Sequence, residues 1–354
     1  MARAAGDSAE SQPTRIACAW RGPAVGSAQQ VGVLAVDWAG GAVAIDVACP
    51  VPSRAHGLLA EPDHEWLAVA YRFGTWLWRL DARGQPMRQF DLGEEAVERR
   101  FAGHVIRSPD GSVLLSTELD PRTGKGFIGV RDPSSLAKLD EWRTHGSDPH
   151  QILVDPDRNV VVANGGVLRA PDDRKRDLDR MASSLVVLDG RNGALLGKWT
   201  LGDARLSLRH LAYSTIAPGE RPLLGIALQA EHDDAARRSA APVLAVFDGA
   251  QLVVPSFAAQ GGGYAGDIAP APGGFVVSCQ HAGCALWWQR DLPAQLATVA
   301  ELRQVCAVSA LVEPDGGIVM AGGLGVGRWH PRQAAALLPW PAPMALDNHW
   351  VTLA

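Results

Sequence analysis

Histidine is the residue type whose spacing in this sequence suggests chemistry. The chain has ten histidines among 354 residues, and several of them occupy the same place in a repeated pattern of apolar runs. The stretch FAGHVIRSPDGSVLLSTELD, residues 101–120, shows this pattern: an apolar run with His104, a Pro-Asp-Gly turn and a second run ending at Glu118. Such turn residues favour a tight reversal between two strands. We therefore expect a β-hairpin that brings His104 and Glu118 together.

The hairpin pattern recurs along the whole chain. Similar pairs of apolar runs begin near Ala55, Asp148, Leu208, Ala265 and Val305. Further strand-like runs follow each hairpin, so that four strands recur every roughly forty to sixty residues, which is typical of propeller blades.

The two ends of the chain complete each other in this scheme. The N-terminal runs TRIACAW, VGVLAVDW and AVAIDVA supply three strands, and the C-terminal DNHWVTLA supplies a fourth. We expect an all-β fold, a single seven-bladed β-propeller over residues 14–354, whose last blade is closed by the C-terminal strand joining the N-terminal strands. Residues 1–13 are small and polar, and we expect a disordered leader there.

Aligning the units places one residue of each at the same point of the innermost strand. These seven residues are His56, His104, His150, His210, Asp267, Cys306 and His349. Innermost strands surround one axis, so we expect these side chains to converge on one mouth of the central channel. Imidazole is the commonest metal ligand, and with carboxylate or amide neighbours it suits iron, copper or zinc rather than calcium or magnesium.

The ends of the second strands carry a further set of polar side chains: Tyr71 or Arg72, Glu118, Asn164, Gln229, and Gln280 with His281. We predict that a transition metal ion, iron or copper before zinc, or a small metal chelate binds in this funnel. The predicted metal ligands are His56, His104, Glu118, His150, His210, His281 and His349. Arg209, Asn164 and Gln229 are the predicted contacts to a bound cofactor.

Two other functions are open at this point. The same side chains could serve a lactonase-like hydrolase or an oxidoreductase, with Arg209 or Arg72 holding an anionic substrate. Alternatively, the histidines only close the channel and the propeller is a platform for protein interaction. Walker and dinucleotide fingerprints are absent from suitable contexts, so we expect no nucleotide cofactor.

Composition excludes several classes of partner. The net charge is −5, which is no footprint for nucleic acid. The longest apolar runs are about eight residues, too short for membrane insertion. Five cysteines are an odd number and no disulfide framework. The stretch CQHAGC, residues 279–284, is compatible with a cross-strand disulfide, a soft-metal site or two buried thiols, and the charged run at 169–181 fits a solvated loop better than a lid.

Several of these stretches resemble a family of bacterial proteins known as domain of unknown function 1513. The resemblance rests on GHVIRSPDGSVLLSTELDPRTGKGFIGVRD, DPHQILVDPDRNVVVANGG, LDRMASSLVVLD, LSLRHLA, YAGDIA and DNHWV, in consistent order over residues 52–351. It implies a quinoprotein-like propeller that is exported through the twin-arginine route and is often encoded beside imelysin-type iron-uptake proteins. The matching histidines are His104, His150, His210 and His349.

The chain also departs from the family pattern. The segments VLRAPDD and SCQHAGC differ from it on the funnel face, and the twin-arginine leader is missing. A periplasmic location is therefore implied by the resemblance alone, and the chain would otherwise be cytoplasmic. The function we expect is metal acquisition in the periplasm, with imelysin-type proteins as expected partners.

Overall fold

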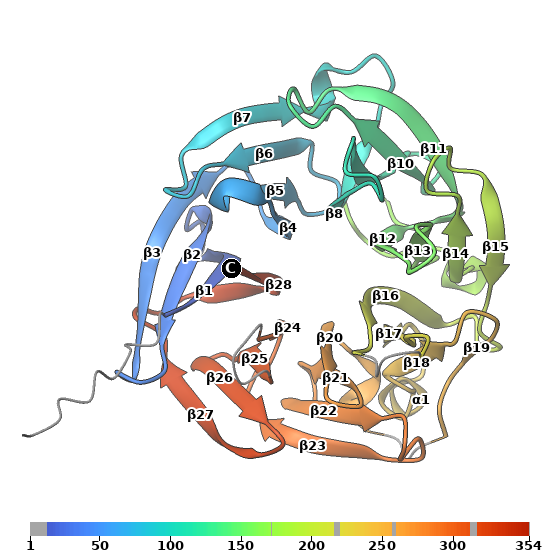
Figure 1. The fold of residues 1–354 in the computed structure, drawn as a ribbon. Helices are drawn as coiled ribbons and strands as arrows, with labels where there is room; N and C mark the ends of the chain where they lie inside the picture. Colours follow the sequence, from blue (N-terminus) through green and yellow to red (C-terminus); the bar gives the residue numbers. More distant parts are fainter. Residues whose placement is uncertain (1–12, 171, 216–219, 257–259, 312–316, 354) are drawn as a thin grey trace, which may run out of the picture.

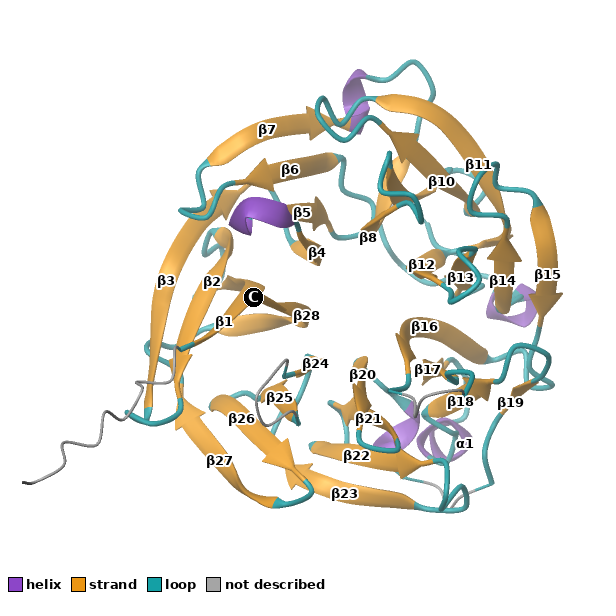
Figure 2. Cartoon of the chain, in the orientation of Figure 1, coloured by secondary structure: helices purple, strands orange, loops and turns teal. Residues whose placement is uncertain are grey.

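Seven four-stranded antiparallel sheets form a ring in the computed structural model, which describes residues 13–170, 172–215, 220–256, 260–311 and 317–353 (Figures 1 and 2). The seven-bladed propeller expected from the repeats is thereby confirmed. The expected leader lies outside the described residues except for Pro13.

Each blade is written here from its innermost strand outward. The first is β28 (Ala345–Leu353), β1 (Thr14–Arg21), β2 (Gln29–Asp37) and β3 (Ala42–Val51), and the second is β4 (Ala55–Ala60), β5 (Trp66–Ala70), β6 (Trp76–Leu80) and β7 (Pro86–Asp91). The third is β8 (Arg100–Arg107), β9 (Leu114–Leu119), β10 (Lys125–Arg131) and β11 (Lys138–Ser147), and the fourth is β12 (Pro149–Val154), β13 (Val160–Asn164), β14 (Ser184–Leu188) and β15 (Leu195–Trp199).

The remaining three blades follow in chain order. They are β16 (Leu206–Tyr213), β17 (Leu224–Ala230), β18 (Leu244–Phe247) and β19 (Leu252–Val253); β20 (Asp267–Ala271), β21 (Gly274–Cys279), β22 (Cys284–Gln289) and β23 (Leu296–Glu301); and β24 (Val308–Ala310), β25 (Ile318–Ala321), β26 (Gly325–His330) and β27 (Gln333–Pro339). Helical structure in the described part of the chain is limited to α1 (Ala235–Ser239) and the 3-10 turns η1 (Pro62–His64), η2 (Leu92–Glu94), η3 (Leu178–Arg180) and η4 (Gly261–Gly263).

The ring closes as expected between the two ends of the chain. Strand β28 pairs antiparallel with β1, from Arg15 opposite Leu353 to Arg21 opposite Ala345. The C-terminal strand is thus the innermost strand of the blade that the N-terminal strands begin (Figure 1).

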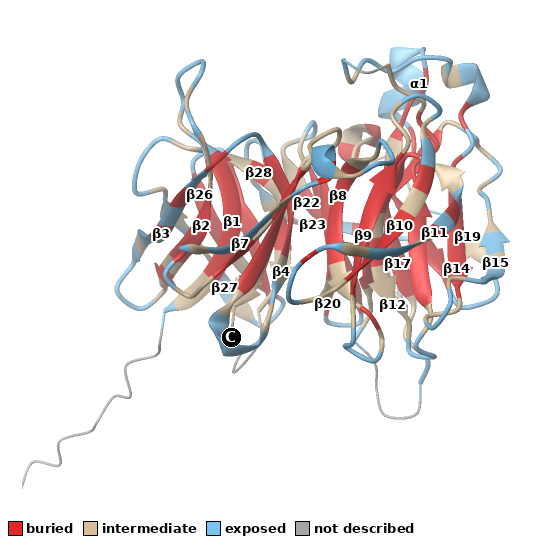
Figure 3. Ribbon diagram, turned by 90° about the horizontal axis from the view of Figure 1, so that it is seen from above, coloured by how far each residue is buried: buried red, intermediate tan, exposed pale blue. Residues whose placement is uncertain are grey.

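The hydrophobic core lies between neighbouring blades rather than at one centre. The apolar cluster between the first two blades, for example, joins Val31 and Val33 of β2 to Trp66 of β5 and Trp76 of β6. The strand interiors are buried, and exposed residues concentrate in the outermost strands and the connecting loops (Figure 3). The innermost strands consequently need no apolar core of their own, and their inward-facing side chains are free to be polar.

Candidate metal centre

Five histidines from five blades meet on the propeller axis. Ligand nitrogens of His56, His104, His150 and His210 lie within 4.8 Å of one another. The ring centroids of these four histidines are 4.7 to 5.4 Å apart. His349 stands beside them, with its ring centroid 5.1 to 6.0 Å from three of the others. The structure therefore brings these five histidines together, as the sequence predicts.

Each histidine sits at an irregularity of its strand. The pairing register shifts at or around the histidine in β4, β8, β12, β16 and β28. Strands β20 and β24, the innermost strands without a histidine, pair with their neighbours in unbroken register. A β-bulge bends its strand locally and re-aims a side chain. The bulges thus turn five imidazoles toward one axis.

The hydrogen bonds of His56 and His210 fix their tautomers. Nδ1 of His56 lies 3.1 Å from a carboxylate oxygen of Asp347, and Nδ1 of His210 lies 2.6 Å from the carbonyl oxygen of Gly266. Burial works against ionisation of Asp347, but the His56 hydrogen bond and the Arg54 charge hold the pKa of this carboxyl well below its usual range. Because a carboxylate and a carbonyl only accept hydrogen bonds, both Nδ1 atoms must carry the proton.

The Nε2 lone pairs of His56 and His210 consequently face each other. Nε2 of His210 lies 3.4 Å from Nε2 of His56 and 3.2 Å from Nε2 of His150. Only His150 can supply a proton between these three atoms, so at least one contact joins two lone pairs. A tetrahedral ion with metal–nitrogen distances of about 2.0 to 2.1 Å holds its nitrogens about 3.3 Å apart. The spacing of the imidazoles therefore fits a metal ion.

Burial also keeps these imidazoles neutral. It lowers the pKa of His56 to about 4, the opposing charge of Asp347 notwithstanding. Burial likewise lowers the pKa values of His104, His150 and His210 well below their ordinary value, and the charges of neighbouring imidazoles and arginines lower them further. Neutral imidazole is the form that binds a metal, so the cluster is competent at neutral pH without losing a proton.

Two further nitrogens in the cluster lack a partner among the described residues. Nε2 of His104, in a side chain that is almost fully buried, makes no hydrogen bond. Nδ1 of His349 makes none either, although it lies 3.6 Å from Oδ1 of Asp267. His210, Asp267 and His349 form a second group with metal-ligand spacing. Buried polar atoms without partners are costly, and a bound ion would satisfy them.

Glu118 does not join the histidines. It pairs with Phe101 across the hairpin, and the neighbouring Thr117 is the residue that accepts a hydrogen bond from the His104 backbone, at 3.1 Å. Successive side chains of a strand point to opposite faces, so Glu118 faces away from His104. Its buried carboxylate instead lies 2.5 Å from Arg131 and 2.7 Å from Lys138. The hairpin expected from the sequence is present, but this pair of ligands is not.

The other predicted site residues have separate environments. His281 is exposed and stacks on Tyr264, with 4.1 Å between the ring centroids, so it is not part of the axial cluster. The amide nitrogen of Asn164 donates to the Thr144 carbonyl at 3.1 Å, and that of Gln229 donates to the Ala265 carbonyl at 3.1 Å. Both amides hold backbone segments. Arg209, next to His210, is fully buried.

Sequence reasoning missed Asp347, which orients His56. The available signal was a short pattern: Asp347 precedes His349 by two residues, as Asp148 precedes His150. Cys306 shared the alignment position of the histidines, but burial raises its pKa to about 12 and its Sγ contacts backbone carbonyls. Cys279 and Cys284 lie opposite each other in β21 and β22, and both are free thiols.

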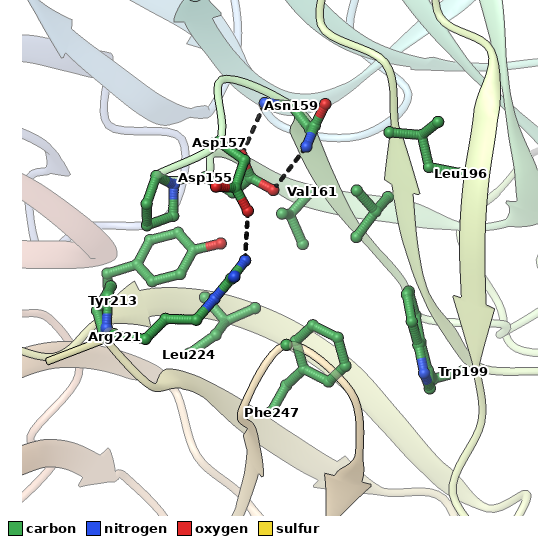
Figure 4. A pocket seen from close by; sticks show the side chains of 14 residues that line it. Asp155, Asp157, Asn159, Val161, Leu196, Trp199, Tyr213, Arg221, Leu224 and Phe247 are labelled. Atoms are coloured by element: carbon green, nitrogen blue, oxygen red, sulfur yellow. Dashed lines mark hydrogen bonds and ion pairs between the residues drawn. The ribbon is translucent and has the colours of Figure 1, made fainter.

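A separate pocket of about 180 Å³ lies between the fourth and fifth blades, at the end away from the histidines. Figure 4 shows the side chains that line it. Tyr213, Trp199 and Phe247 line it, together with an ion pair between Asp157 and Arg221. It is formed by the turns that follow the innermost strands β12 and β16, whereas His150 lies at the beginning of β12. The histidine cluster and this pocket therefore lie toward opposite faces of the propeller.

The fold and the site together define a seven-bladed β-propeller whose axis is filled by a buried histidine cluster. Residues 49–353 match the family described as protein of unknown function (DUF1513), and the chain belongs to that family. The curated proteins include no match to it. None of the helices in the described ranges is long and apolar enough to cross a membrane.

Solved structures of other propellers are similar in fold. Hydrazine synthase of Kuenenia stuttgartiensis is 13% identical, with a TM-score of 0.58 over 88% of this chain and 92% of the other. A putative 6-phosphogluconolactonase from Bacteroides uniformis is 13% identical, with a TM-score of 0.57 over 94% and 99% of the two chains. BamB from Moraxella catarrhalis is 12% identical, with a TM-score of 0.50 over 96% and 91%. Identities this low show the fold alone.

Proposed function

We propose that this protein binds a transition metal ion, iron or copper before zinc, in the axial histidine cluster and serves metal acquisition. The observation that carries the proposal is the meeting of buried, neutral imidazoles whose Nε2 atoms lie 3.2 to 3.4 Å apart. His56, His150 and His210 would be the primary ligands. His104, whose Nε2 lacks a partner, would be the fourth.

The chemistry of the ligands supports a late transition metal. Imidazole nitrogens suit iron, copper and zinc, whereas calcium and magnesium require oxygen ligands. Asp347 accepts a hydrogen bond from Nδ1 of His56, and the Gly266 carbonyl accepts one from Nδ1 of His210. Such outer contacts orient the ring of a ligating histidine and raise its basicity. The periplasmic location and the imelysin-type partners belong to the same proposal and come from the family resemblance.

Metal content tests the proposal directly. The protein is purified without a histidine tag, and its metal is measured by elemental analysis. We expect about one ion per chain in the wild type and almost none in the double variant His104→Ala/His150→Ala.

A matched control is the double variant His64→Ala/His281→Ala, which removes two exposed histidines. It should keep the wild-type metal content. Thermal unfolding of all three proteins shows whether the ligand variant is still folded. Equal and negligible metal in the wild type and the ligand variant, after growth with added iron, copper and zinc, would refute the proposal.

A further inference from the structure

Three arginines surround a single carboxylate beside the histidine cluster. Asp148 precedes His150 by two residues, and its Oδ2 lies 2.9 Å from Nη1 of Arg209, while its Oδ1 lies 3.5 Å from Nη1 of Arg72. All these side chains are at least nine-tenths buried: 0% of Arg209, 8% of Arg72 and 5% of Asp148 is exposed. One buried carboxylate thus faces two buried cations.

Arg169 brings a third positive charge to the same place. Its side chain, only 10% exposed, pairs with Oδ1 of Asp173 at 3.1 Å, in the loop between β13 and β14. Burial, followed by repulsion from Arg72, lowers the pKa of the Arg169 guanidinium even though Asp148 is near. The group therefore places three guanidinium groups near two carboxylates, those of Asp148 and Asp173.

Several donors of these guanidinium groups, and all those of Arg209, lack a hydrogen-bond partner among the described residues. None of the three side-chain nitrogens of Arg209 makes a hydrogen bond with a described residue, because its 2.9 Å contact to Asp148 is poorly directed. Nε of Arg72 and Nε of Arg169 have no partner either. A guanidinium carries five N–H donors, and leaving them unpaired in a buried site is expensive.

The backbone approaches these side chains closely at Gly165. A Cβ atom placed on Gly165 would lie 2.9 Å from Nη1 of Arg209 and 2.8 Å from Oδ2 of Asp148. Gly165 follows the last residue of β13, so this close approach lies at the same end of the blade as His150. Any side chain here would push against Arg209 and Asp148, so glycine allows the guanidinium group to lie where it does.

We propose that Arg72, Arg169 and Arg209 form a binding site for a small oxyanion, a carboxylate or a phosphate, at the mouth of the histidine cluster. Guanidinium groups bind both anions through paired, charge-assisted hydrogen bonds. Arg209 is the residue before His210, so an anion on the arginines lies next to the imidazoles. The ligand of the funnel is then a metal ion that is accompanied by an anionic chelator.

This inference rests on the proposed function only for the presence of a metal ion in the histidine cluster. The arginines would bind the anion whether or not a metal ion is bound. Metal-free protein, prepared with a chelator that is then removed, is titrated calorimetrically with citrate and with inorganic phosphate, at constant ionic strength set by sodium chloride. We expect saturable binding of at least one of the two. Tighter binding of citrate assigns a carboxylate ligand, and tighter binding of phosphate assigns a phosphate ligand.

Two variants test the site, and a third variant serves as the control. Arg72→Gln removes a charge at the mouth and should weaken anion binding about tenfold to a hundredfold. Gly165→Ala places a methyl group against Arg209 and Asp148, displaces the guanidinium group without changing charge, and should weaken binding to a similar extent. Arg221→Gln removes an arginine that pairs with Asp157 on the opposite side of the ring, and it should bind the anion like the wild type.

The outcomes separate this inference from the metal proposal. Binding that is weakened at least tenfold in Arg72→Gln and Gly165→Ala but retained in His104→Ala/His150→Ala supports the anion site, even if elemental analysis finds no metal. Absence of binding to wild-type protein, or equal affinities in all variants, overturns it, whatever the metal content. Thermal unfolding of each variant shows that the comparison is made between folded proteins.

Discussion

At the scale of single residues, the site depends on which nitrogen of each imidazole carries the proton. His56 donates through Nδ1 to Asp347, and His210 donates through Nδ1 to the Gly266 carbonyl. Both contacts leave Nε2 free to act as a ligand. The anion and metal proposals share this arrangement, in which an aspartate two residues ahead of a histidine meets an arginine: Asp347 with Arg54, and Asp148 with Arg209.

Replacing Asp347 by asparagine tests its role in positioning His56. Asp347→Asn removes the negative charge that fixes the His56 tautomer and that pairs with Arg54. Metal affinity should fall about tenfold to a hundredfold, since partners of ligating histidines have effects of this size. A competition titration against a chelator of known affinity measures it. The control Asp46→Asn, which loses an exposed pair with Arg15, should bind metal normally, and unchanged affinity in Asp347→Asn would contradict the role given to that residue.

Glu118 should matter for stability and not for metal binding. Its carboxylate is fully buried between Arg131 and Lys138, and Glu118→Gln leaves these cations short of negative charge. We expect a loss of about 3 kcal/mol in the free energy of unfolding, measured with urea, at unchanged metal content. Glu98→Gln, at an exposed pair with Arg100, should cost less than about 1 kcal/mol. A loss of metal from folded Glu118→Gln would restore the sequence-based assignment of Glu118 as a ligand.

At the scale of the strand, the bulges hold the histidines in place. The innermost strands approach closely there: a Cβ on Gly57 of β4 would lie 2.2 Å from the Gly103 carbonyl of β8. Gly103 itself has φ of +112°, and a Cβ there would lie 2.7 Å from the His56 ring. Glycine at these positions therefore lets two bulged strands bring His56 and His104 into contact.

The pair of variants Gly103→Ala and Gly111→Ala separates this packing from backbone strain. Both residues have positive φ, but a Cβ on Gly111 would meet nothing within 4 Å. Gly111→Ala should cost about 1 kcal/mol of unfolding free energy and leave metal binding intact. Gly103→Ala should cost more and lower metal affinity, because it displaces the His56 ring. Equal behaviour of the two variants in urea unfolding and in metal titration would show that the close approach does not position the ring.

At the scale of the whole molecule, the ring concentrates titratable groups where water is excluded. The seven innermost strands β4, β8, β12, β16, β20, β24 and β28 surround the axis (Figure 1). Five of them contribute an imidazole to it. The apolar packing between blades supports this arrangement, because each blade is held by its neighbours on both sides and not by the axis. The protein can therefore carry a polar centre that is costly to protonate.

Acid should destabilise the metal-free protein through these histidines. Burial lowers the pKa of His56 to about 4, while an unfolded histidine has a pKa of about 6.5. Between these two values the unfolded chain binds a proton that the folded chain does not, so unfolding becomes easier as the pH falls. From pH 7 to about pH 5, His56 alone should lower the free energy of unfolding by about 2 kcal/mol, and His104, His150 and His210 should add to this loss.

Urea unfolding at several pH values measures this dependence. His56→Gln should flatten the curve between about pH 6.5 and 4, whereas His64→Ala/His281→Ala should leave it as steep as in the wild type. A metal-free protein that is equally stable at pH 7 and at pH 5 would show that the imidazoles are not held neutral by burial.

The repeat pattern of the sequence predicts the number of blades, their closure by DNHWVTLA and the axial position of five histidines. These features are local: turn residues mark each hairpin, and the repeat places one histidine at the same point of each innermost strand. The direction of each side chain, by contrast, depends on how the strands are paired and packed. Thr117 rather than Glu118 contacts His104, because a strand alternates its faces and a bulge shifts that alternation. The meeting of three Nε2 atoms and of three arginines around Asp148 likewise depends on contacts between blades far apart in the chain, which no local pattern encodes.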